Sequence, residues 1–323
     1  MKIMICGGAG YIGAHMNKML HAAGHQTVVF DNLATGHQEA VKWGELITGE
    51  LLNKHDLQTA FKQHNIDAVM HFSARSLVAE SCSNPSLYFQ NNVVGTLNLL
   101  DAMREAGIDK FIFSSTAAIF GNPISESIDE SHPKEPINPY GRSKLMVEHA
   151  LQSYAQAYSL NSVALRYFNA AGADPEGELG ENHEPETHLI PNILKAAKGE
   201  PGKSLTIFGN DYPTRDGTCV RDYVHVNDLC SAHLLALEFL ETNQGAHAFN
   251  LGSGSGYSVM EVLNAAQQVV GQEIPYTMAD RRAGDPATLI ANSARAQEIL
   301  GWQPKITDIN EIVATAWGWI RDH

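Results

Sequence analysis

The sequence has few cysteines, few cationic residues and no long apolar run. Only four of its 323 residues are cysteine, and no two form a Cys-x-x-Cys pair. A disulfide scaffold is excluded, because such scaffolds are short and dense in cysteine. We therefore expect reduced, buried thiols and a cytoplasmic protein.

Positive charge is scarce as well. The chain has 22 Lys and Arg against 36 Asp and Glu, a formal net charge of −14. Nucleic acids and anionic membranes are bound through clustered positive charge, so neither partner is expected. No apolar run approaches the roughly 18 residues of a membrane span. The opening run, MKIMIC, is too short for a signal-peptide core and leads directly into glycines.

The fifteen histidines include one close helical pair, His21 and His25. Gly24 lies between them, where a helix would end. A solvated helix terminus is the expected reading of this pair, and no metal site is predicted.

Apolar runs and amphipathic stretches alternate through the first half of the chain. The apolar runs predict strands at residues 2–6, 27–30, 68–72, 110–114 and 162–167. The amphipathic stretches predict helices at residues 11–23, 56–64, 86–106 and 140–158. Such alternation indicates the α/β class, with a Rossmann-type, doubly wound parallel sheet covered on both faces.

The second half has a different texture. Residues 173–186 are rich in Gly, Pro, Asp and Glu and predict a loop. Helices are predicted at residues 189–198, 227–240, 258–270 and 309–320, and a strand at 205–208. The length exceeds the roughly 250–300 residues at which a single core stops growing. We expect a first domain over residues 1–170, rejoined by a segment near 218–242, and a smaller mixed α/β domain over 171–323.

The run CGGAGYIGAH places Gly7, Gly10 and Gly13 between the first predicted strand and the first helix. Glycines at this spacing let the backbone approach a pyrophosphate and let the helix pack on the strand. Asp31 ends the second strand, where a carboxylate binds ribose hydroxyls and repels a 2′-phosphate. No Lys or Arg lies between residues 31 and 41 to offset that repulsion. A dinucleotide site that prefers NAD to NADP is predicted.

The stretch NPYGRSK is the one place where a tyrosine precedes a lysine by four residues. Asn138 and Pro139 favour a helix start, so Tyr140 and Lys144 would share one helix face. A free tyrosine, with a pKa near ~10, is a poor base at neutral pH. Lys144 and a positive nicotinamide ring would lower that pKa if water were excluded. A pair of side chains on an exposed helix face is the alternative.

The run KFIFSSTAAIFG favours the functional alternative, because Ser115 and Thr116 end a strand at the carboxyl edge of the sheet, where ligands bind in such folds. The glycine turn, the Ser-Ser-Thr strand end and the Tyr-x-x-x-Lys helix together resemble the extended short-chain dehydrogenase/reductases. Four later stretches are similar to the UDP-hexose 4-epimerase branch of that family: RYFNAAGA, IFGNDYPTRDGTCVRDYVHVNDL, NLGSGSGYSV and RRAGD. The resemblance covers essentially the whole chain.

The resemblance implies the roles of particular residues. Tyr140 would be the catalytic base, Lys144 its electrostatic partner and Thr116 the hydroxyl that shares the substrate proton. NAD would be bound by the first domain, through Gly7, Gly10, Tyr11, Ile12, Gly13, Asp31, Asn32, Glu50, Leu51, Phe72, Ser73, Asn91, Ser114, Tyr140, Lys144 and Tyr167. The UDP-sugar would be bound mainly by the second, through Thr116, Asn169, His188, Leu189, Phe208, Arg221, Tyr223, Arg282 and Asp285.

The sequence departs from the family pattern at a few positions. Glu50 stands where Asp is usual, Arg75 is one position from a usual cofactor lysine, and Phe120 replaces a Tyr. Leu289 occupies the place of a gate beside the sugar, where a bulky residue excludes N-acetyl sugars and a small one admits them. Leucine is intermediate, so UDP-hexoses, UDP-N-acetylhexosamines and UDP-pentoses all stay open.

The family resemblance also suggests a reaction. Its dehydratases carry Asp-Glu after the strand-end threonine, where this chain has Ala117 and Ala118. A 4-epimerase of UDP-glucose and UDP-galactose, acting through a 4-keto intermediate with tightly bound NAD, is therefore predicted. A non-catalytic NAD sensor is the alternative from another class. The family is usually dimeric through the long helices; Leu145, Ala150 and Leu151 fit either that interface or packing on the sheet.

Overall fold

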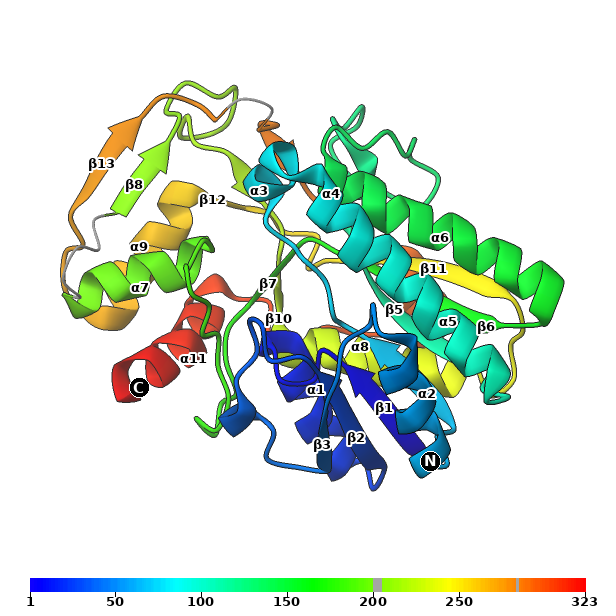
Figure 1. The fold of residues 1–323 in the computed structure, drawn as a ribbon. Coiled ribbons are helices and arrows are strands. Elements are labelled where there is room, and N and C mark those ends of the chain that lie inside the picture. Colours follow the sequence, from blue (N-terminus) through cyan, green and yellow to red (C-terminus); the bar gives the residue numbers. More distant parts are fainter. Residues whose placement is uncertain (200–204, 283–284) are drawn as a thin grey trace.

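The structure is a computed structural model that describes residues 1–199, 205–282 and 285–323. Within these ranges, seven strands form a parallel sheet in the order β11-β6-β5-β4-β1-β2-β3 (Figure 1). This order confirms the predicted Rossmann-type fold. The strands are β1 (Lys2–Cys6), β2 (Gln26–Asp31), β3 (Glu45–Thr48), β4 (Ala68–His71), β5 (Lys110–Thr116), β6 (Asn161–Tyr167) and β11 (Ala246–Leu251).

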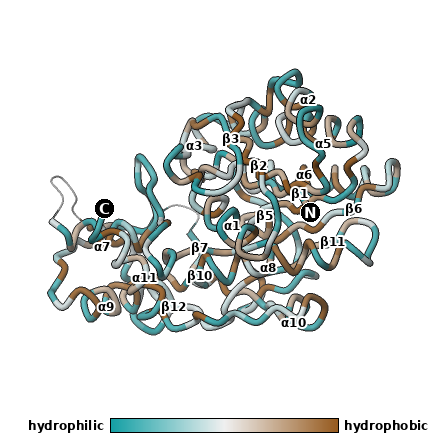
Figure 2. Tube along the Cα trace, turned by 90° about the horizontal axis from the view of Figure 1, so that it is seen from below, coloured by the Kyte–Doolittle hydropathy of each residue, from teal (hydrophilic) through white to brown (hydrophobic). Residues whose placement is uncertain are grey.

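Alternating side chains of the strands supply two cores, one on each face of the sheet. Ile3 and Ile5 of β1 face a cluster with α1 (Tyr11–Ala22) and α8 (Val226–Phe239). Met4 and Cys6 face a second cluster with α2 (Lys54–Gln63), α5 (Gly95–Glu105) and α6 (Pro139–Tyr158). In Figure 2 the apolar colour follows the strands, while polar colour marks many of the connecting loops.

The predicted helix at residues 86–106 is built from three consecutive pieces. These are α4 (Pro85–Tyr88), a π-helical turn η2 (Phe89–Val94) and α5. π-Helical turns occur frequently at functional sites. This one carries Asn91, a predicted cofactor residue, and the buried Asn92. The short helix α3 (Val78–Ser83) precedes it.

The second part of the molecule lies beyond the carboxyl ends of the large sheet (Figure 1). Its core gathers α7 (Leu189–Lys198), α9 (Val259–Val270) and α11 (Ile309–Asp322). Three small sheets surround it: β7 (Asn169–Ala171) with β10 (Tyr223–His225); β9 (Val220–Arg221) with β12 (Tyr257–Ser258) and β14 (Thr288–Leu289); and β8 (Leu205–Phe208) with β13 (Tyr276–Ala279). The remaining elements are α10 (Ala294–Leu300) and the 3-10 turns η1 (Gln38–Ala40) and η3 (Ala117–Phe120).

Two strands of the large sheet were not predicted. β3 has no fully buried residue, and β11 is buried only in its second half, so neither has a continuous apolar run. The segment expected to rejoin the first domain was 218–242. Phe249 and Leu251 of β11 also pack in the core with α1 and α8, so the returning stretch is longer. Trp302, which is fully buried, packs in that same core.

Over the described part of the chain, no helix combines the length and apolar character needed to cross a lipid bilayer.

Candidate active site

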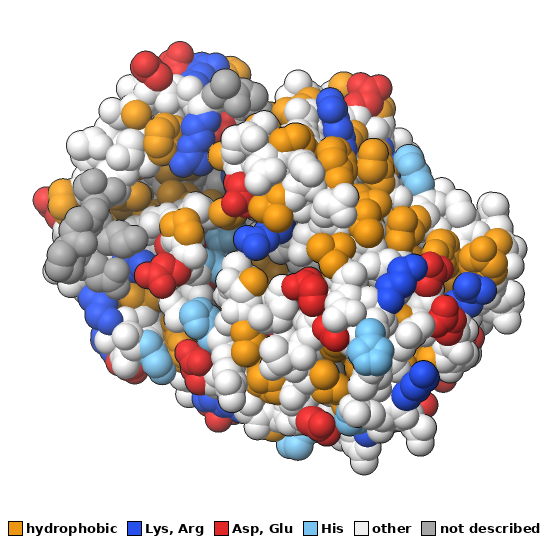
Figure 3. Space-filling view, in the orientation of Figure 1, with side chains coloured by type: hydrophobic (Ala, Val, Ile, Leu, Met, Phe, Trp, Pro, Cys, Tyr) orange, Lys and Arg blue, Asp and Glu red, His pale blue; other side chains and the backbone are white. Residues whose placement is uncertain are grey.

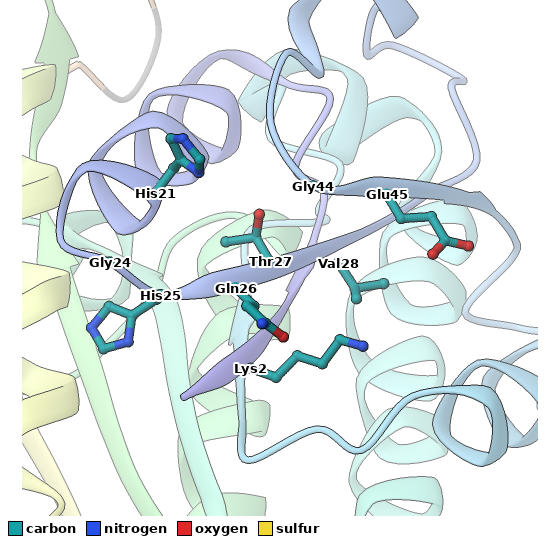
Figure 4. Close-up of a pocket in the computed structure, with 9 residues that line it drawn as sticks. All are labelled: Lys2, His21, Gly24, His25, Gln26, Thr27, Val28, Gly44 and Glu45. Carbon is teal, nitrogen blue, oxygen red and sulfur yellow. The ribbon is translucent and has the colours of Figure 1, made fainter.

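The carboxyl ends of β1, β2, β4, β5 and β6 meet at one edge of the sheet. The chain reverses its winding between β1 and β4, which is where ligands bind in doubly wound sheets. Figure 3 shows a hollow on this side of the molecule, between its two parts. The pocket drawn in Figure 4 lies at the opposite edge, because Lys2 and Gln26 in its lining begin β1 and β2. That open pocket of about 410 Å³ is therefore separate from the predicted site.

The glycine turn has the predicted geometry. Gly7 has φ +81°, and an added Cβ would lie 2.5 Å from Ser73 N. At Gly13 it would lie 2.1 Å from Gly7 O, so both glycines are required by the protein itself. At Gly10 the nearest atom would be 3.5 Å away, an ordinary contact. The open space at Gly10 and the absence of a side-chain cap on α1 fit a phosphate approaching the helix N-terminus.

Asp31 lies at the end of β2 with its carboxylate fixed by two backbone donors. Ala9 N donates to Oδ2 (3.0 Å) and Leu33 N to Oδ1 (2.8 Å). A carboxylate has about four acceptor positions, so two stay free for ribose hydroxyls. Asn32 follows, and its Nδ2 donates to Glu50 Oε2 (2.8 Å). The residues present therefore fit an adenosine ribose, and the Glu50 carboxylate lies beside Asn32.

The other predicted cofactor residues lie along the same edge. Tyr11 is buried and its hydroxyl donates to Gly172 O (2.7 Å), while Leu51 is buried in the core beneath. The ring of Phe72 lies 4.8 Å from that of His233. Ser114 Oγ hydrogen-bonds the Tyr167 hydroxyl. Ile12, Ser73 and Asn91 belong to the first turn of α1, the turn after β4 and the π-helical turn η2.

Tyr140 and Lys144 share one face of α6, which begins as predicted with Asn138 as its cap and Pro139 at its start. The Asn138 side chain accepts from Gly141 N (2.8 Å). Lys144 is buried, and its Nζ donates to Ser114 O (2.7 Å) and lies 4.8 Å from the centroid of the Phe113 ring. The alternative, in which Tyr140 and Lys144 lie on an exposed helix face, is therefore wrong.

The Thr116 hydroxyl lies at the base of this arrangement. Its oxygen accepts from Ala118 N (3.2 Å), which leaves its proton available for donation. Burial raises the pKa of Tyr140, and the neighbouring Thr116 side chain acts in the opposite direction by stabilising the phenolate. The phenol that sequence motifs predicted thus stands beside the predicted hydroxyl.

Burial also lowers the pKa of Lys144 to about 7, and the Glu148 carboxylate opposes that shift. The reaction needs a lowered Tyr140 pKa, whereas burial in the protein alone raises it. The lowered pKa stays a prediction for the protein with oxidised cofactor, whose positive ring is the missing charge.

A polar network beneath the site was missed by sequence reasoning. Glu148 accepts from Ser115 Oγ (2.6 Å) and forms a buried ion pair with Arg166. Asn92 Nδ2 donates to Ser143 Oγ (3.0 Å) and to Arg75 O (3.0 Å). The available signal was spacing, because residues 140, 144 and 148 recur every four positions on one helix face.

Six of the predicted substrate residues form three neighbouring pairs in the second part. Asn169 lies opposite Tyr223 in the β7–β10 register, and its Nδ2 donates to Asp222 O (2.9 Å). Arg221 and Asp285 form an ion pair of 3.3 Å. The Arg282 guanidinium lies 4.1 Å from the Phe208 ring centroid. Leu189 begins α7 and packs at the edge of the core formed by α7, α9 and α11.

His188 caps α7, but its ring is already engaged. The Nδ1 atom of His188 contacts Glu181 Oε1. The Nδ1 atom of His183 lies 3.0 Å from the same oxygen. Glu186 lies in the same group. The sequence carried a signal for this cluster, the spacing Glu-x-His-x-x-Glu-x-His, within and just after a segment interpreted only as a loop.

Leu289 lies opposite Arg221 in the β9–β14 register and packs beside Ala117, Ile119 and Phe120. It therefore connects the predicted diphosphate arginine with the turn that follows Thr116. Phe120 is fully buried in this cluster, so its departure from the family's tyrosine serves packing.

Comparison with known proteins identifies the family of the chain. Residues 3–252 match the NAD dependent epimerase/dehydratase family. A UDP-glucose 4-epimerase of Lacticaseibacillus casei is 52% identical over 324 residues, which cover 100% of this chain and 98% of that protein. A solved structure of a UDP-glucose 4-epimerase superposes with a TM-score of 0.97 at 48% identity, covering 100% of this chain and 98% of that chain.

A second solved structure, of the UDP-glucose 4-epimerase from Brucella ovis in complex with NAD, has a TM-score of 0.95 at 47% identity and covers 98% of this chain and 97% of that one. The chain belongs to the NAD dependent epimerase/dehydratase family. Within that family, the relatives described here are all similar to it over essentially their full length.

Proposed function

We propose that this chain is an NAD-dependent isomerase that interconverts UDP-glucose and UDP-galactose. The observation that carries the proposal is the placement of Tyr140, Lys144 and the Thr116 hydroxyl at the carboxyl end of β5, beside a fitted dinucleotide cradle. NAD, bound by the glycine turn and Asp31, would supply reversible hydride acceptance at the sugar C4.

The protein's own groups move the proton. Tyr140 as phenolate takes the proton of the C4 hydroxyl, and Thr116 hydrogen-bonds the same oxygen and the phenol. Lys144, held by Ser114 O, keeps positive charge near the phenolate. The 4-keto sugar would then turn about its link to the diphosphate and take the hydride back at C4 on its other face, while Tyr140 returns the proton to the C4 oxygen.

The surroundings of Thr116 limit what else happens to the keto sugar. Ala117 and Ala118 follow it in η3, and no acid occurs between residues 114 and 121. Without a second acid/base group near C5 and C6, elimination of water has no catalyst. Arg221 and Arg282 would hold the diphosphate as the sugar turns, since guanidinium forks match phosphate oxygens.

The activity is tested by supplying UDP-galactose and detecting UDP-glucose with UDP-glucose dehydrogenase. Turnover without added NAD is expected, because the cofactor is regenerated in each cycle and stays bound. Extracting the purified protein should release about one NAD per chain. A preparation that contains NAD but does not form UDP-glucose contradicts the proposal.

A wider sugar range is the second candidate. Leu289 packs in the cluster that follows Thr116, where it would limit the space beside C2 of the sugar. Its intermediate size favours UDP-hexoses while leaving UDP-N-acetylhexosamines and UDP-pentoses as slower substrates. A panel of these UDP-sugars in the same assay separates the two candidates.

We also propose that the chain forms a homodimer through η2, α5 and α6. Leu151 is buried in the core and Leu145 packs beside Phe120, so these two pack within the subunit. Val94 and Met146 are instead 37% and 48% exposed. Figure 3 shows hydrophobic side chains gathered over this side of the molecule. Light scattering that returns a mass near 70 kDa, twice the 35.2 kDa of the chain, is the expected result.

We propose that the two parts of the molecule bind different ligands. Residues 1–170, with the returning segment near 218–242, would bind NAD, and residues 171–323 would supply most contacts to the UDP-sugar. A cytoplasmic location is proposed with it, consistent with four free thiols; Cys6, Cys219 and Cys230 are buried as expected, whereas Cys82 is exposed.

A further inference from the structure

Four metal-binding side chains converge on the loop that precedes α7. Glu181, His183, Glu186 and His188 each present one ligand atom, and these atoms all lie within 4.8 Å of one another. His183 Nδ1 is 3.0 Å from Glu181 Oε1, and His188 Nδ1 is 3.9 Å from Glu186 Oε1. Ligands at ~2.0–2.1 Å from a tetrahedral zinc ion stand roughly 3.4 Å apart, between these two distances.

A second observation points to a missing ligand. Glu186 Oε1 accepts from Thr187 N (2.8 Å) and His188 N (3.0 Å), whereas Oε2 is buried without a hydrogen-bond partner, and the Glu186 side chain is 0% exposed. The Lys195 ammonium lies 3.7 Å away, too far for a hydrogen bond. Lys195 therefore pairs with the Glu186 charge without donating to Oε2, and a buried carboxylate oxygen that accepts no hydrogen bond is costly. The neighbouring group Asp174, Glu176 and Glu178 differs, because Lys18 contacts all three carboxylates at 2.6–2.8 Å.

We propose that Glu181, His183, Glu186 and His188 bind one divalent transition-metal ion, with Zn²⁺ as the preferred occupant. Two imidazoles exclude a typical Ca²⁺ or Mg²⁺ site, since those ions take oxygen ligands. Four protein ligands leave no open position for a reacting water, so the site is structural.

The position of the loop gives the metal a consequence. Tyr11, at the start of α1, meets the His183 ring edge-on at 6.3 Å, and Asn182 O accepts from His37 Nε2 (2.9 Å). Leu189, the first residue of α7, follows His188 directly. The ion would therefore fix the loop between α1, which follows the glycine turn, and α7 in the second part of the molecule.

Metal content of the full chain tests this proposal. The untagged protein, purified from zinc-supplemented medium and dialysed without chelator, is expected to hold about one Zn²⁺ per chain by mass spectrometry. After removal by a chelator, Co²⁺ should restore one equivalent, with visible bands of tetrahedral cobalt. Wild-type protein that holds no zinc and shows no cobalt bands overturns the proposal.

Two variants assign the ligands. His183→Gln and Glu186→Gln should each reduce retained zinc to less than about a tenth of an equivalent, because each removes one of four ligands. His55→Gln, at an exposed position on α2, and Glu176→Gln, in the neighbouring acidic group, are matched controls that should keep it. Full zinc retention in both ligand variants, with circular dichroism unchanged, also overturns the assignment. If a variant does not fold, the cobalt spectrum of the wild-type chain decides.

Discussion

Arg166 donates two hydrogen bonds to the Glu148 carboxylate beneath the candidate catalytic residues. Nε lies 3.0 Å from Oε1 and Nη2 lies 2.6 Å from Oε2, with the two side chains only 5% and 6% exposed. Glu148 lies one turn beyond Lys144 on α6, and Arg166 lies on β6, beside the catalytic strand β5. The ion pair therefore sets the position of the catalytic helix against the sheet.

Glu148→Gln is expected to lower both stability and activity. It leaves the buried Arg166 without its counter-charge, which costs about 3 kcal/mol of unfolding free energy. It also removes the carboxylate that holds up the pKa of Lys144. Lys144 then loses its proton at lower pH, so the alkaline limb of the kcat profile should move to lower pH. Denaturant unfolding and kcat against pH measure the two effects.

The matched control for that variant is Glu273→Gln. Glu273 is exposed and its side chain lies outside the network, so stability and pH profile should stay unchanged. Identical behaviour of the two variants contradicts the positioning role.

Tyr140→Phe should abolish turnover while NAD stays bound. General base catalysis by a positioned side chain is worth about 10²–10⁴ in rate, and phenylalanine keeps the ring that packs against Tyr88. The coupled assay measures kcat, and extraction measures NAD. Tyr158→Phe, on the same helix but 53% exposed, should behave as wild type. Retained activity in Tyr140→Phe would mean that another group acts as the base, whereas a wild-type protein that binds NAD without turnover would support the NAD-sensor alternative.

Asp31→Ala is expected to weaken NAD retention and to reduce the preference over NADP. The variant removes acceptors for two ribose hydroxyls, and hydrogen bonds to a charged group are each worth about 1.5–3 kcal/mol. A loss of about tenfold or more in NAD affinity follows. Equilibrium dialysis with both dinucleotides measures it. An unchanged ratio between them counts against the role assigned to Asp31.

Three buried histidines predict a loss of stability in acid. Burial lowers the pKa of His15 to about 4, of His71 to about 3 and of His233 to about 4, from an ordinary value of 6.5. Lys144 adds to the lowering at His71, whereas Asp174 opposes it at His15. The unfolded chain therefore binds protons that the folded chain does not.

Their contribution is fully present above pH 6.5 and is lost progressively as the pH falls toward 4. Unfolding free energies measured between pH 7.5 and about 5 should fall with a slope set by this proton uptake. His233→Gln should reduce the slope by up to one proton, and His55→Gln, at an exposed position on α2, is the control variant. A flat profile contradicts the prediction.

Leu289 variants should change the sugar range. Leu289→Ala enlarges the space beside Ala117 and Phe120 and should raise kcat/KM for UDP-N-acetylgalactosamine by about tenfold or more. Leu289→Tyr should lower it while UDP-galactose is still converted. Ile299→Ala, at a 44% exposed position on α10, is the control. Equal ratios of the two substrates in all variants would remove Leu289 from the specificity determinants.

Local sequence patterns carried most of the fold and much of the site. Continuous apolar runs marked β1, β4, β5 and β6 because strands buried on both faces need them. β3 and β11 were missed because β3 has no fully buried residue and the first half of β11 is only half-buried, and the pairing that makes them strands comes from distant residues. Glu148 and Arg166 are eighteen residues apart, so nothing local linked them.

By itself, the sequence determined the glycine turn, the acid that ends β2, the Tyr-x-x-x-Lys helix and its cap, because each depends on backbone conformation and spacing within a few residues. Only the tertiary structure decided which carbonyl receives Lys144, how far burial moves the pKa of Tyr140, and that two glutamates and two histidines of one loop meet. Those properties depend on what other segments bring to the same place, since desolvation and ion pairing are set by neighbours in space.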